Sequence, residues 1–389
     1  MTRLTRQEYA AALRGRYHAA GKSERGRILD ECCRTTGCHR KAAIRLLRRA
    51  PARRARRRGR PCRYGPELLP LLTQLWEVSD RACGKLLAPL LPTLVPALER
   101  HGELRVAPEL RPHLLRLSPA TLDRLLRPIR RRLSRQPHGP RAPASLLARQ
   151  VPLRTFGEWH DVRPGSVQGD LVLHCGETTA GFYLTTLVGV DVATSWTELE
   201  PVWGLGHRRV GTGVHHIRQR LPFPLREWHS DNGSEFLNAR LVVWCRREGI
   251  RFTRGRSYRK NDQAWVEQKN GFVVRRLVGY DRYSSRAAYL VLQGLYGLLR
   301  LQLNFFRPVR KLVSKRRVGS TVLKRYDAAQ TPYQRLLAAE VLSAAQRQAL
   351  ERQFLTINPV ALAQQITRTL ETLWTLSESP RARKQATVG

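Results

Sequence analysis

The feature that most constrains the fold is a change of residue pattern near Trp159. Before this position leucine and arginine recur at helical spacing, whereas β-forming residues dominate three short runs after it. These runs cover residues 171–174, 182–190 and 195–202. Their connections are short enough for hairpins, which predicts a three-strand antiparallel meander. Helices and strands then alternate, so we expect an α/β core with a mixed sheet.

A chain of 389 residues is long enough for two or three domains. Shifts in composition and pattern divide it into six segments, and the expected fold class is multidomain, with α-helical modules before the α/β core. The segments are a helix-turn-helix DNA-binding module (1–50), an arginine-rich linker (51–64), a second helical DNA-binding module (65–135), a linker (136–155), the α/β core (156–300) and a basic C-terminal extension with a helical tail (301–389).

The charge of the chain indicates its partner. Seventy Lys and Arg face thirty Asp and Glu, a formal net charge of +40. An excess of this size predicts a polyanionic partner. Because the basic residues occur in every segment and not in one amphipathic helix, nucleic acid is favoured over an anionic membrane surface.

Other features of composition bear on location. No stretch reaches 18 apolar residues, and the first thirty residues lack the apolar segment of a signal peptide, so we expect neither a membrane span nor secretion. Seven cysteines without paired spacing indicate free thiols in a reducing compartment. A cytoplasmic protein associated with the nucleoid is expected.

The N-terminal module has the pattern of a helix-turn-helix. Gly37 interrupts the first helical pattern, and a basic helix is predicted over residues 38–47. Its outward residues, the expected DNA contacts, are His39, Arg40, Lys41 and Arg45. An ordinary basic helical hairpin is the alternative.

The arginine-rich linker contains a second DNA-binding pattern. Arg58-Gly59-Arg60-Pro61 resembles the core of an AT-hook, in which an extended Arg-Gly-Arg lies in a narrow minor groove. Arg58 and Arg60 are therefore candidate DNA contacts. A linker that binds phosphates without sequence preference is an equal alternative.

Three acidic residues are candidates for catalysis. Asp170 lies in the first predicted strand, and Asp231 follows a predicted strand and precedes a helix, where α/β sheets usually place chemistry. Glu267 lies in a segment with helical spacing, and 35 residues separate it from Asp231.

This constellation resembles the catalytic motif of DDE transposases and retroviral-type integrases, in which about 35 residues separate the second Asp from the Glu. The resemblance covers residues 159–283 most strongly, and the whole chain is similar to insertion-sequence transposases of bacteria. It implies that Asp170, Asp231 and Glu267 form the catalytic triad on a ribonuclease-H-like fold. It also implies a homo-oligomer on DNA, because two element ends are brought together.

The reaction implied by the resemblance explains the residue types. Two hard cations, Mg²⁺ or Mn²⁺, need oxygen ligands to drive an in-line displacement at phosphorus. In a chain this basic, acids facing DNA also argue for a metal. The alternative is that each acid is a cap, turn or ion-pair residue, and Asp161 and Asp191 are nearby acids without an assigned role. No zinc site is expected, because Cys33, Cys38 and His39 lack a second ligand pair.

Four polar residues near Glu267 are further candidate DNA contacts. If residues 261–277 are helical, Gln263 and Asn270 share a face with Glu267 and can reach the same DNA end. Lys260 and Lys269 would then bind phosphates, with solvated lysines on a helix as the alternative.

The sequence therefore predicts a DNA transposase that binds terminal inverted repeats and catalyses metal-dependent strand cleavage and transfer to target DNA. Two alternatives remain open. A ribonuclease-H-like nuclease would use the same carboxylates and metals without joining strands. A noncatalytic, domesticated DNA-binding regulator would need only the N-terminal modules.

Overall fold

The computed structural model describes residues 3–48, 64–65, 67–132, 162–231, 233, 235–236, 238–256 and 263–378. Contacts divide the chain into two compact units, Met1–Gly65 and Pro66–Gly389. The division is coarser than the six segments expected from the sequence, because helices 68–132 belong to the same unit as the α/β core.

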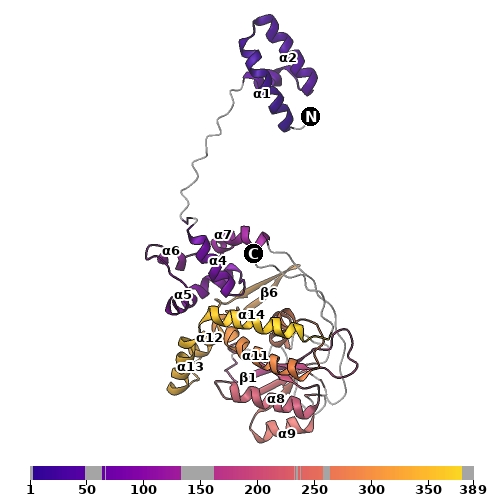
Figure 1. Ribbon diagram of the computed structural model, residues 1–389, viewed down its shortest axis with the longest axis vertical. Helices are drawn as coiled ribbons and strands as arrows, with labels where there is room; N and C mark the ends of the chain where they lie inside the picture. Colours follow the sequence, from indigo (N-terminus) through magenta and orange to yellow (C-terminus); the bar gives the residue numbers. More distant parts are fainter. Residues whose placement is uncertain are drawn as a thin grey trace. The chain divides into compact units, whose positions relative to one another are not determined.

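The first unit contains three helices in its described part (Figure 1). They are α1 (Arg3–Ala19), α2 (Lys22–Thr36) and α3 (Arg40–Arg48). Gly37 ends α2 with a left-handed φ of 66°, a conformation that glycine adopts at no steric cost. The basic helix expected from residue 38 therefore begins at Arg40, after a turn of three residues. Ile28, Cys32 and Leu47 are buried in the centre of this unit.

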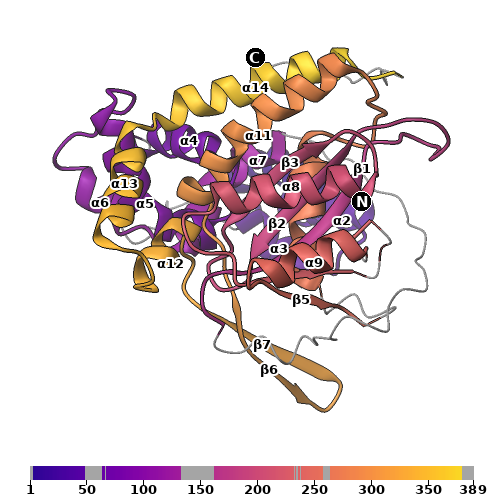
Figure 2. The ribbon, with the colours of Figure 1, turned by 90° about the horizontal axis from the view of Figure 1, so that it is seen from below.

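A five-strand mixed sheet forms the centre of the second unit (Figure 2). Its strands are β1 (Ser166–Leu173), β2 (Thr185–Asp191), β3 (Thr197–Val202), β4 (Glu227–Ser230) and β5 (Arg251–Arg254), in the order β3-β2-β1-β4-β5. The pairs β1–β2 and β2–β3 are antiparallel, so the predicted meander is confirmed. The pairs β1–β4 and β4–β5 are parallel, which makes the sheet mixed as expected.

Helices cover both faces of the sheet. α8 (His207–Arg220) and α9 (Ala239–Arg247) pack with Val167 and Trp228 in one apolar cluster. Successive residues of a strand point to opposite faces, so Gln168 lies opposite Val167. Gln168 Oε1 accepts a 3.4 Å hydrogen bond from the Val266 amide in α10 (Ala264–Lys269), which places α10 on the other face.

α11 (Arg286–Phe306) also lies against the face that α10 contacts. Tyr296 hydrogen-bonds Thr186 of β2, and the Asn304 side chain binds both the amide and the carbonyl of Thr197 in β3. The sheet is therefore enclosed between two helical layers, and its central strands are buried.

The other helices of the second unit come from the segments before and after the sheet in the sequence. They are α4 (Leu68–Val78), α5 (Gly84–Arg100), α6 (Arg111–Leu115), α7 (Pro119–Arg132), α12 (Pro332–Ala338), α13 (Ala344–Thr356) and α14 (Pro359–Thr375). Side-chain hydrogen bonds join the two groups, from Gln334 to Thr93 at 3.0 Å and from Asn358 to Glu103 at 2.7 Å. The helical tail expected at residues 340–376 therefore consists of two helices that pack back onto the unit. None of the helices described is both long and apolar enough to span a bilayer.

Candidate active site

Asp170 lies in the middle of β1 and on the same face as Gln168, toward α10. Its carboxylate is half-buried and accepts two hydrogen bonds, from the Leu171 amide at 2.8 Å and from the Asn270 side-chain amide at 2.5 Å. The second bond joins β1 to the helical segment that carries Glu267. This contact crosses 100 residues of sequence and fixes the position of the carboxylate.

Asp231 lies beside Asp170 in the topology of the sheet. β1 and β4 are parallel neighbours, and their last pair is Gln168 opposite His229. Asp170 and Asp231 each lie two residues beyond this pair. Since neighbouring strands run about 4.8 Å apart, the same count along both strands places the two aspartates level with each other, Asp170 within β1 and Asp231 just after β4.

A tight turn holds the Asp231 side chain. The Gly233 amide donates to Asp231 Oδ1 at 2.9 Å, and a Cβ at Gly233 would lie 2.7 Å from Glu235 Oε1. Glycine thus leaves room in this turn for the carboxylates of both Glu235 and Asp231. Burial raises the pKa of Asp231, the Gly233 hydrogen bond lowers it, and the charge of Glu235 raises it, with a net upward shift. The site thus concentrates negative charge that a cation would offset.

Glu267 lies in α10, a single short helix that continues into a π-helix over Asn270–Arg275. The sequence predicted one regular helix over 261–277, and the described part, from residue 263, is divided instead. π-helical turns occur mostly as local features, often near functional sites. Glu267 and Asn270 are three residues apart, so both lie toward the side of the helix that meets β1.

The three predicted acids therefore lie on elements that contact one another: β1, the turn after β4, and α10, which packs on β1. In the part of the chain that the structure describes, however, no group of three His, Cys, Asp or Glu side chains is placed to hold a metal ion. The donor chemistry nevertheless fits a hard cation, because the acids supply oxygen ligands. Asn270 Oδ1 is also buried beside Asp170 without a hydrogen-bond partner among the described residues.

The residue before Asp170 has to be glycine. A Cβ at Gly169 would lie 2.1 Å from Cζ2 of Trp228, which is fully buried between β4 and α8. We predict that Gly169→Ala displaces this indole and lowers the free energy of unfolding by about 1–3 kcal/mol, measured by urea denaturation. The control is Gly294→Ala in α11, where the added methyl meets no atom within 4 Å. A Gly169→Ala variant as stable as wild type would contradict this account.

Three of the four expected DNA contacts near Glu267 are buried. Lys269 is 6% exposed, and burial, with the charge of Arg307, lowers its pKa to about 8. Gln263 is 7% exposed, and its Nε2 has no hydrogen-bond partner among the described residues. Asn270 is buried as well and binds Asp170. Phosphate binding by Lys269 stays a prediction, and in this structure α10 turns that side chain inward.

The expected contacts of the N-terminal unit are exposed. His39, Arg40, Lys41 and Arg45 lie at the surface of the α2–α3 turn and of α3, opposite buried Ala43 and Leu47. The Arg40 guanidinium forms an ion pair with Asp30 of α2. DNA binding by this face stays a prediction. Arg58, Arg60 and Lys260 lie outside the described residues, as does Asp161.

The nearby acid Asp191 stabilises the backbone next to β2. It is fully buried at the end of β2 and accepts hydrogen bonds from the Gly165 amide at 2.8 Å and from the Thr194 amide and hydroxyl at 2.8 and 2.6 Å. The bonds from Thr194 close the turn between β2 and β3, and the bond from Gly165 joins it to the segment before β1.

The buried His174 has its pKa lowered to about 3 by burial and by the charge of Arg275, so it stays neutral near pH 7.

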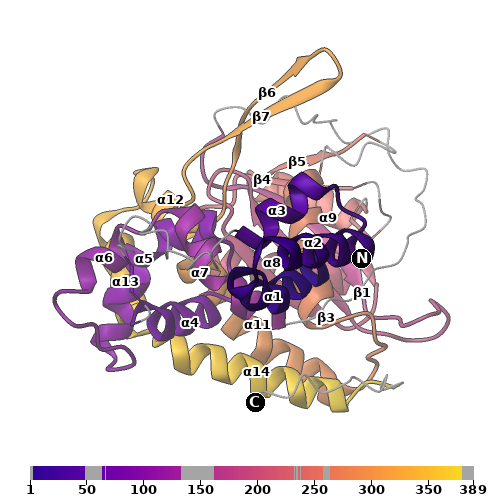
Figure 3. The same cartoon turned by 90° about the horizontal axis from the view of Figure 1, so that it is seen from above.

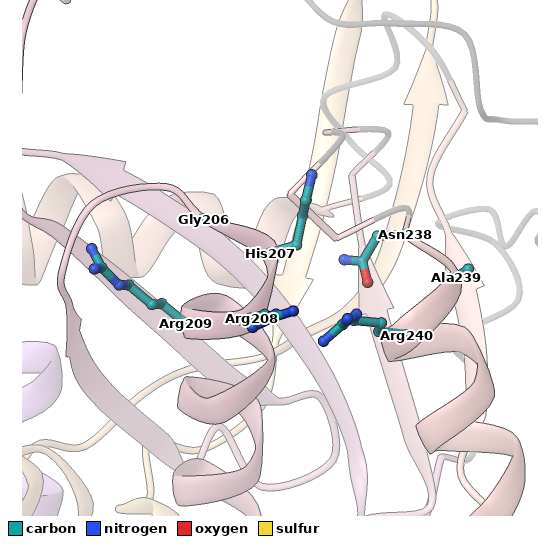
Figure 4. Close-up of a pocket in the computed structure, with 7 residues that line it drawn as sticks. All are labelled: Gly206, His207, Arg208, Arg209, Asn238, Ala239 and Arg240. Atoms are coloured by element: carbon teal, nitrogen blue, oxygen red, sulfur yellow. The ribbon is translucent and has the colours of Figure 1, made fainter.

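The sequence analysis missed a basic cavity beside the Asp231 loop. The first residues of α8 and α9 enclose about 430 Å³ (Figure 4). Its lining residues are Gly206, His207, Arg208, Arg209, Asn238, Ala239 and Arg240. Arg208 and Arg240 point toward each other across it, and Asn238 Nδ2 donates to the Glu235 carbonyl at 2.9 Å. The sequence signal for this cavity is the start of two helices, at Gly206 and at Asn238. Arg208 and Arg209 follow the first start, and Arg240 follows the second.

Three comparisons with known proteins were made. No family model matches the chain. The uncharacterized protein y4rM of Sinorhizobium fredii (strain NBRC 101917 / NGR234) is 47% identical over 332 residues, which are 85% of this chain and 95% of that protein.

Among solved structures, the catalytic core domain of BIV integrase is 19% identical, with a TM-score of 0.29, over 45% of this chain and 95% of that one. The HTLV-2 integrase catalytic core domain, in a dimeric form with magnesium, is 17% identical with the same TM-score, over 38% and 92%. A TM-score of this size does not by itself establish a shared fold.

Proposed function

The chain belongs to the same family as protein y4rM of Sinorhizobium fredii, and we propose that it is a DNA transposase of the Asp-Asp-Glu type. The observation that carries the proposal is that the elements bearing the three acids contact one another, although these acids come from distant parts of the sequence. Asp170 and Asp231 have matching positions on parallel neighbours, and Asn270 joins the Glu267 helix to Asp170. The net charge of +40 supports a polyanionic substrate.

In this proposal Asp170, Asp231 and Glu267 would hold two Mg²⁺ or Mn²⁺ ions. When bound, the metal supplies activation of the attacking water or 3′-hydroxyl and charge stabilisation at the leaving oxygen. Asp170 would contribute negative charge from within β1, Asp231 from the turn after β4, and Glu267 from α10. Bringing all three to one metal centre requires side-chain movement from the arrangement described.

The protein's own contacts support positioning of these groups. The Asn270 amide orients one Asp170 oxygen, while the Leu171 amide binds the other. Gly233 keeps Asp231 and Glu235 close in the turn after β4. Binding of element ends by the N-terminal helices and of target DNA elsewhere belongs to the same proposal, as does assembly into an oligomer that joins two ends.

The experiment is strand cleavage and joining by the purified full chain on a labelled duplex that carries the ends of its own element. We expect joined product with Mg²⁺ or Mn²⁺ and none with EDTA. Cleavage without joining would instead identify a nuclease. Tight binding with neither product would identify a DNA-binding regulator.

The Asn270 contact gives a separate prediction. Asn270→Ala should lower the rate of joining about tenfold, because removing a positioning hydrogen bond worth about 1.4 kcal/mol in the transition state has that effect. The apparent affinity for DNA should not change, so single-turnover rates at saturating DNA are the measurement. A matched control is Asn358→Ala, which removes an amide bonded to Glu103 in the helical layer. Equal rates for Asn270→Ala and wild type would remove Asn270 from the positioning role.

A further inference from the structure

A two-strand hairpin stands out from the second unit. β6 (Leu312–Val318) and β7 (Thr321–Tyr326) pair with each other and are joined by a turn at Gly319 and Ser320. Figures 2 and 3 both show this hairpin extending away from the sheet and the helices. Every residue of β7 is exposed. The hairpin is thus a ribbon with both faces open.

The ribbon is strongly basic. The segment 310–326 contains seven Lys and Arg and no Asp or Glu. The exposed basic residues that the structure describes in this segment are Arg310, Arg316, Arg317, Lys324 and Arg325. In the register Arg316 pairs with Leu323 and Arg317 with Val322, so successive positions place basic residues on both faces of the ribbon.

Apolar side chains lie between the basic ones. Half of the large apolar residues that are exposed in the described chain belong to this ribbon, and they are Leu312, Val313, Val318, Val322, Leu323 and Tyr326. Val313 is 61% exposed and Leu323 is 56% exposed. Such a concentration of exposed apolar surface marks an interaction site.

The base of the ribbon is held firmly to the core. Lys311 Nζ donates to the Ala193 carbonyl at 2.8 Å, in the turn between β2 and β3. Asp327 accepts from the Lys311 amide at 2.7 Å and forms a 2.7 Å ion pair with Arg335 of α12. The one acid at the base is therefore neutralised, and the ribbon keeps a fixed attachment.

The positive charge of the ribbon indicates which kind of partner it binds. A second copy of this ribbon would bring two sets of positive charges together, which costs energy. A polyanion offsets these charges and releases counterions. A two-strand ribbon also fits the major groove of duplex DNA, which is about 12 Å wide. Apolar side chains on such a ribbon can contact thymine methyl groups while arginines bind phosphates and base edges.

We infer that the β6–β7 hairpin is a DNA-binding ribbon that enters a groove of double-stranded DNA. The inference rests on the proposed function for its substrate class and adds a surface outside the candidate active site and the N-terminal helices. It predicts that part of the affinity for duplex DNA comes from Arg316 and Arg317.

The test is the salt dependence of duplex binding by the full chain. Arg316→Ser with Arg317→Ser should lower the slope of log Kd against log salt by about two, roughly one for each phosphate that the variant no longer binds. The control is Arg352→Ser with Arg368→Ser, which removes the same charge from exposed sites on α13 and α14. Thermal unfolding of both variants should match wild type because these side chains are exposed. A hairpin variant with the slope of the control would overturn the inference.

A second experiment separates DNA from a protein partner. Benzoylphenylalanine at position 323 should cross-link labelled duplex on irradiation, whereas the same group at Leu355 of α13, 48% exposed, should not. Cross-linking from position 323 only to a second copy of the chain would overturn the inference. Neither readout requires strand joining. A chain that shows the ribbon effects without joining strands would refute the transposase proposal alone, and joining with an unaffected slope would refute the ribbon alone.

Discussion

Replacing Glu267 with Gln should abolish strand joining while duplex binding stays at the wild-type level. The change keeps the size of the side chain but removes the negative charge that would hold a divalent cation and replaces one acceptor oxygen with an amide donor. Metal assistance in such reactions is worth several kcal/mol, so we expect a loss of about 10³-fold or more in the rate. The measurement is joined product per unit time in single-turnover assays with Mg²⁺ and Mn²⁺.

Two further variants sharpen this result. Asp231→Asn should give the same loss, because Asp231 would share the metal. Glu371→Gln on the exposed surface of α14 changes the same charge far from the site and should leave joining intact. Full activity in both Glu267→Gln and Asp231→Asn would remove the carboxylates from the mechanism, whatever the protein then does to DNA.

Replacing Glu198 with Ala should lower the free energy of unfolding by about 3 kcal/mol. Glu198 is fully buried in β3, where one oxygen accepts from Arg300 Nε at 2.7 Å and the other from Arg220 Nε at 3.2 Å. Trp196 Nε1 donates to it as well, at 2.8 Å. Removing the carboxylate leaves Arg300 without this buried partner and leaves Arg220 with Glu200 alone, which is among the costlier changes in a core. Urea unfolding of the full chain measures the loss.

Glu248 provides the matched control for Glu198. It pairs with Arg218, a neighbour of Arg220 on α8, at 2.8 Å but lies near the surface. Glu248→Ala should cost at most about 1 kcal/mol, because exposed ion pairs contribute little. Equal losses for the two variants would show that burial does not govern the strength of these pairs.

Local patterns predicted much of the core. The three β-rich runs correspond to β1, β2 and β3, and the antiparallel meander is confirmed by their registers. Asp170 lies in the first strand and Asp231 directly after β4, as expected. These features depend on alternation, turn residues and strand propensity, which are properties of short segments. The catalytic role of the three acids stays a prediction.

Other features depended on contacts between distant segments. Phe272, in the π-helix after Glu267, lies beneath the guanidinium groups of Arg276 and Arg307, and both arginines bind Asp80 in the turn between α4 and α5. Residues from three parts of the chain therefore set the rotation of the segment around Glu267. No periodicity within 263–275 contains this information.

The sequence by itself determined the charge of the protein, the meander, and the positions of Asp170 in the first strand and of Asp231 after a later one, because these follow from composition and from neighbours along the chain. Only the tertiary structure decided that Asn270 binds Asp170, that Lys269 is buried and that β6 and β7 form an exposed ribbon. The physical reason is that the orientation of a helix and the exposure of a hairpin are set by what packs against them, and those partners lie up to hundreds of residues away.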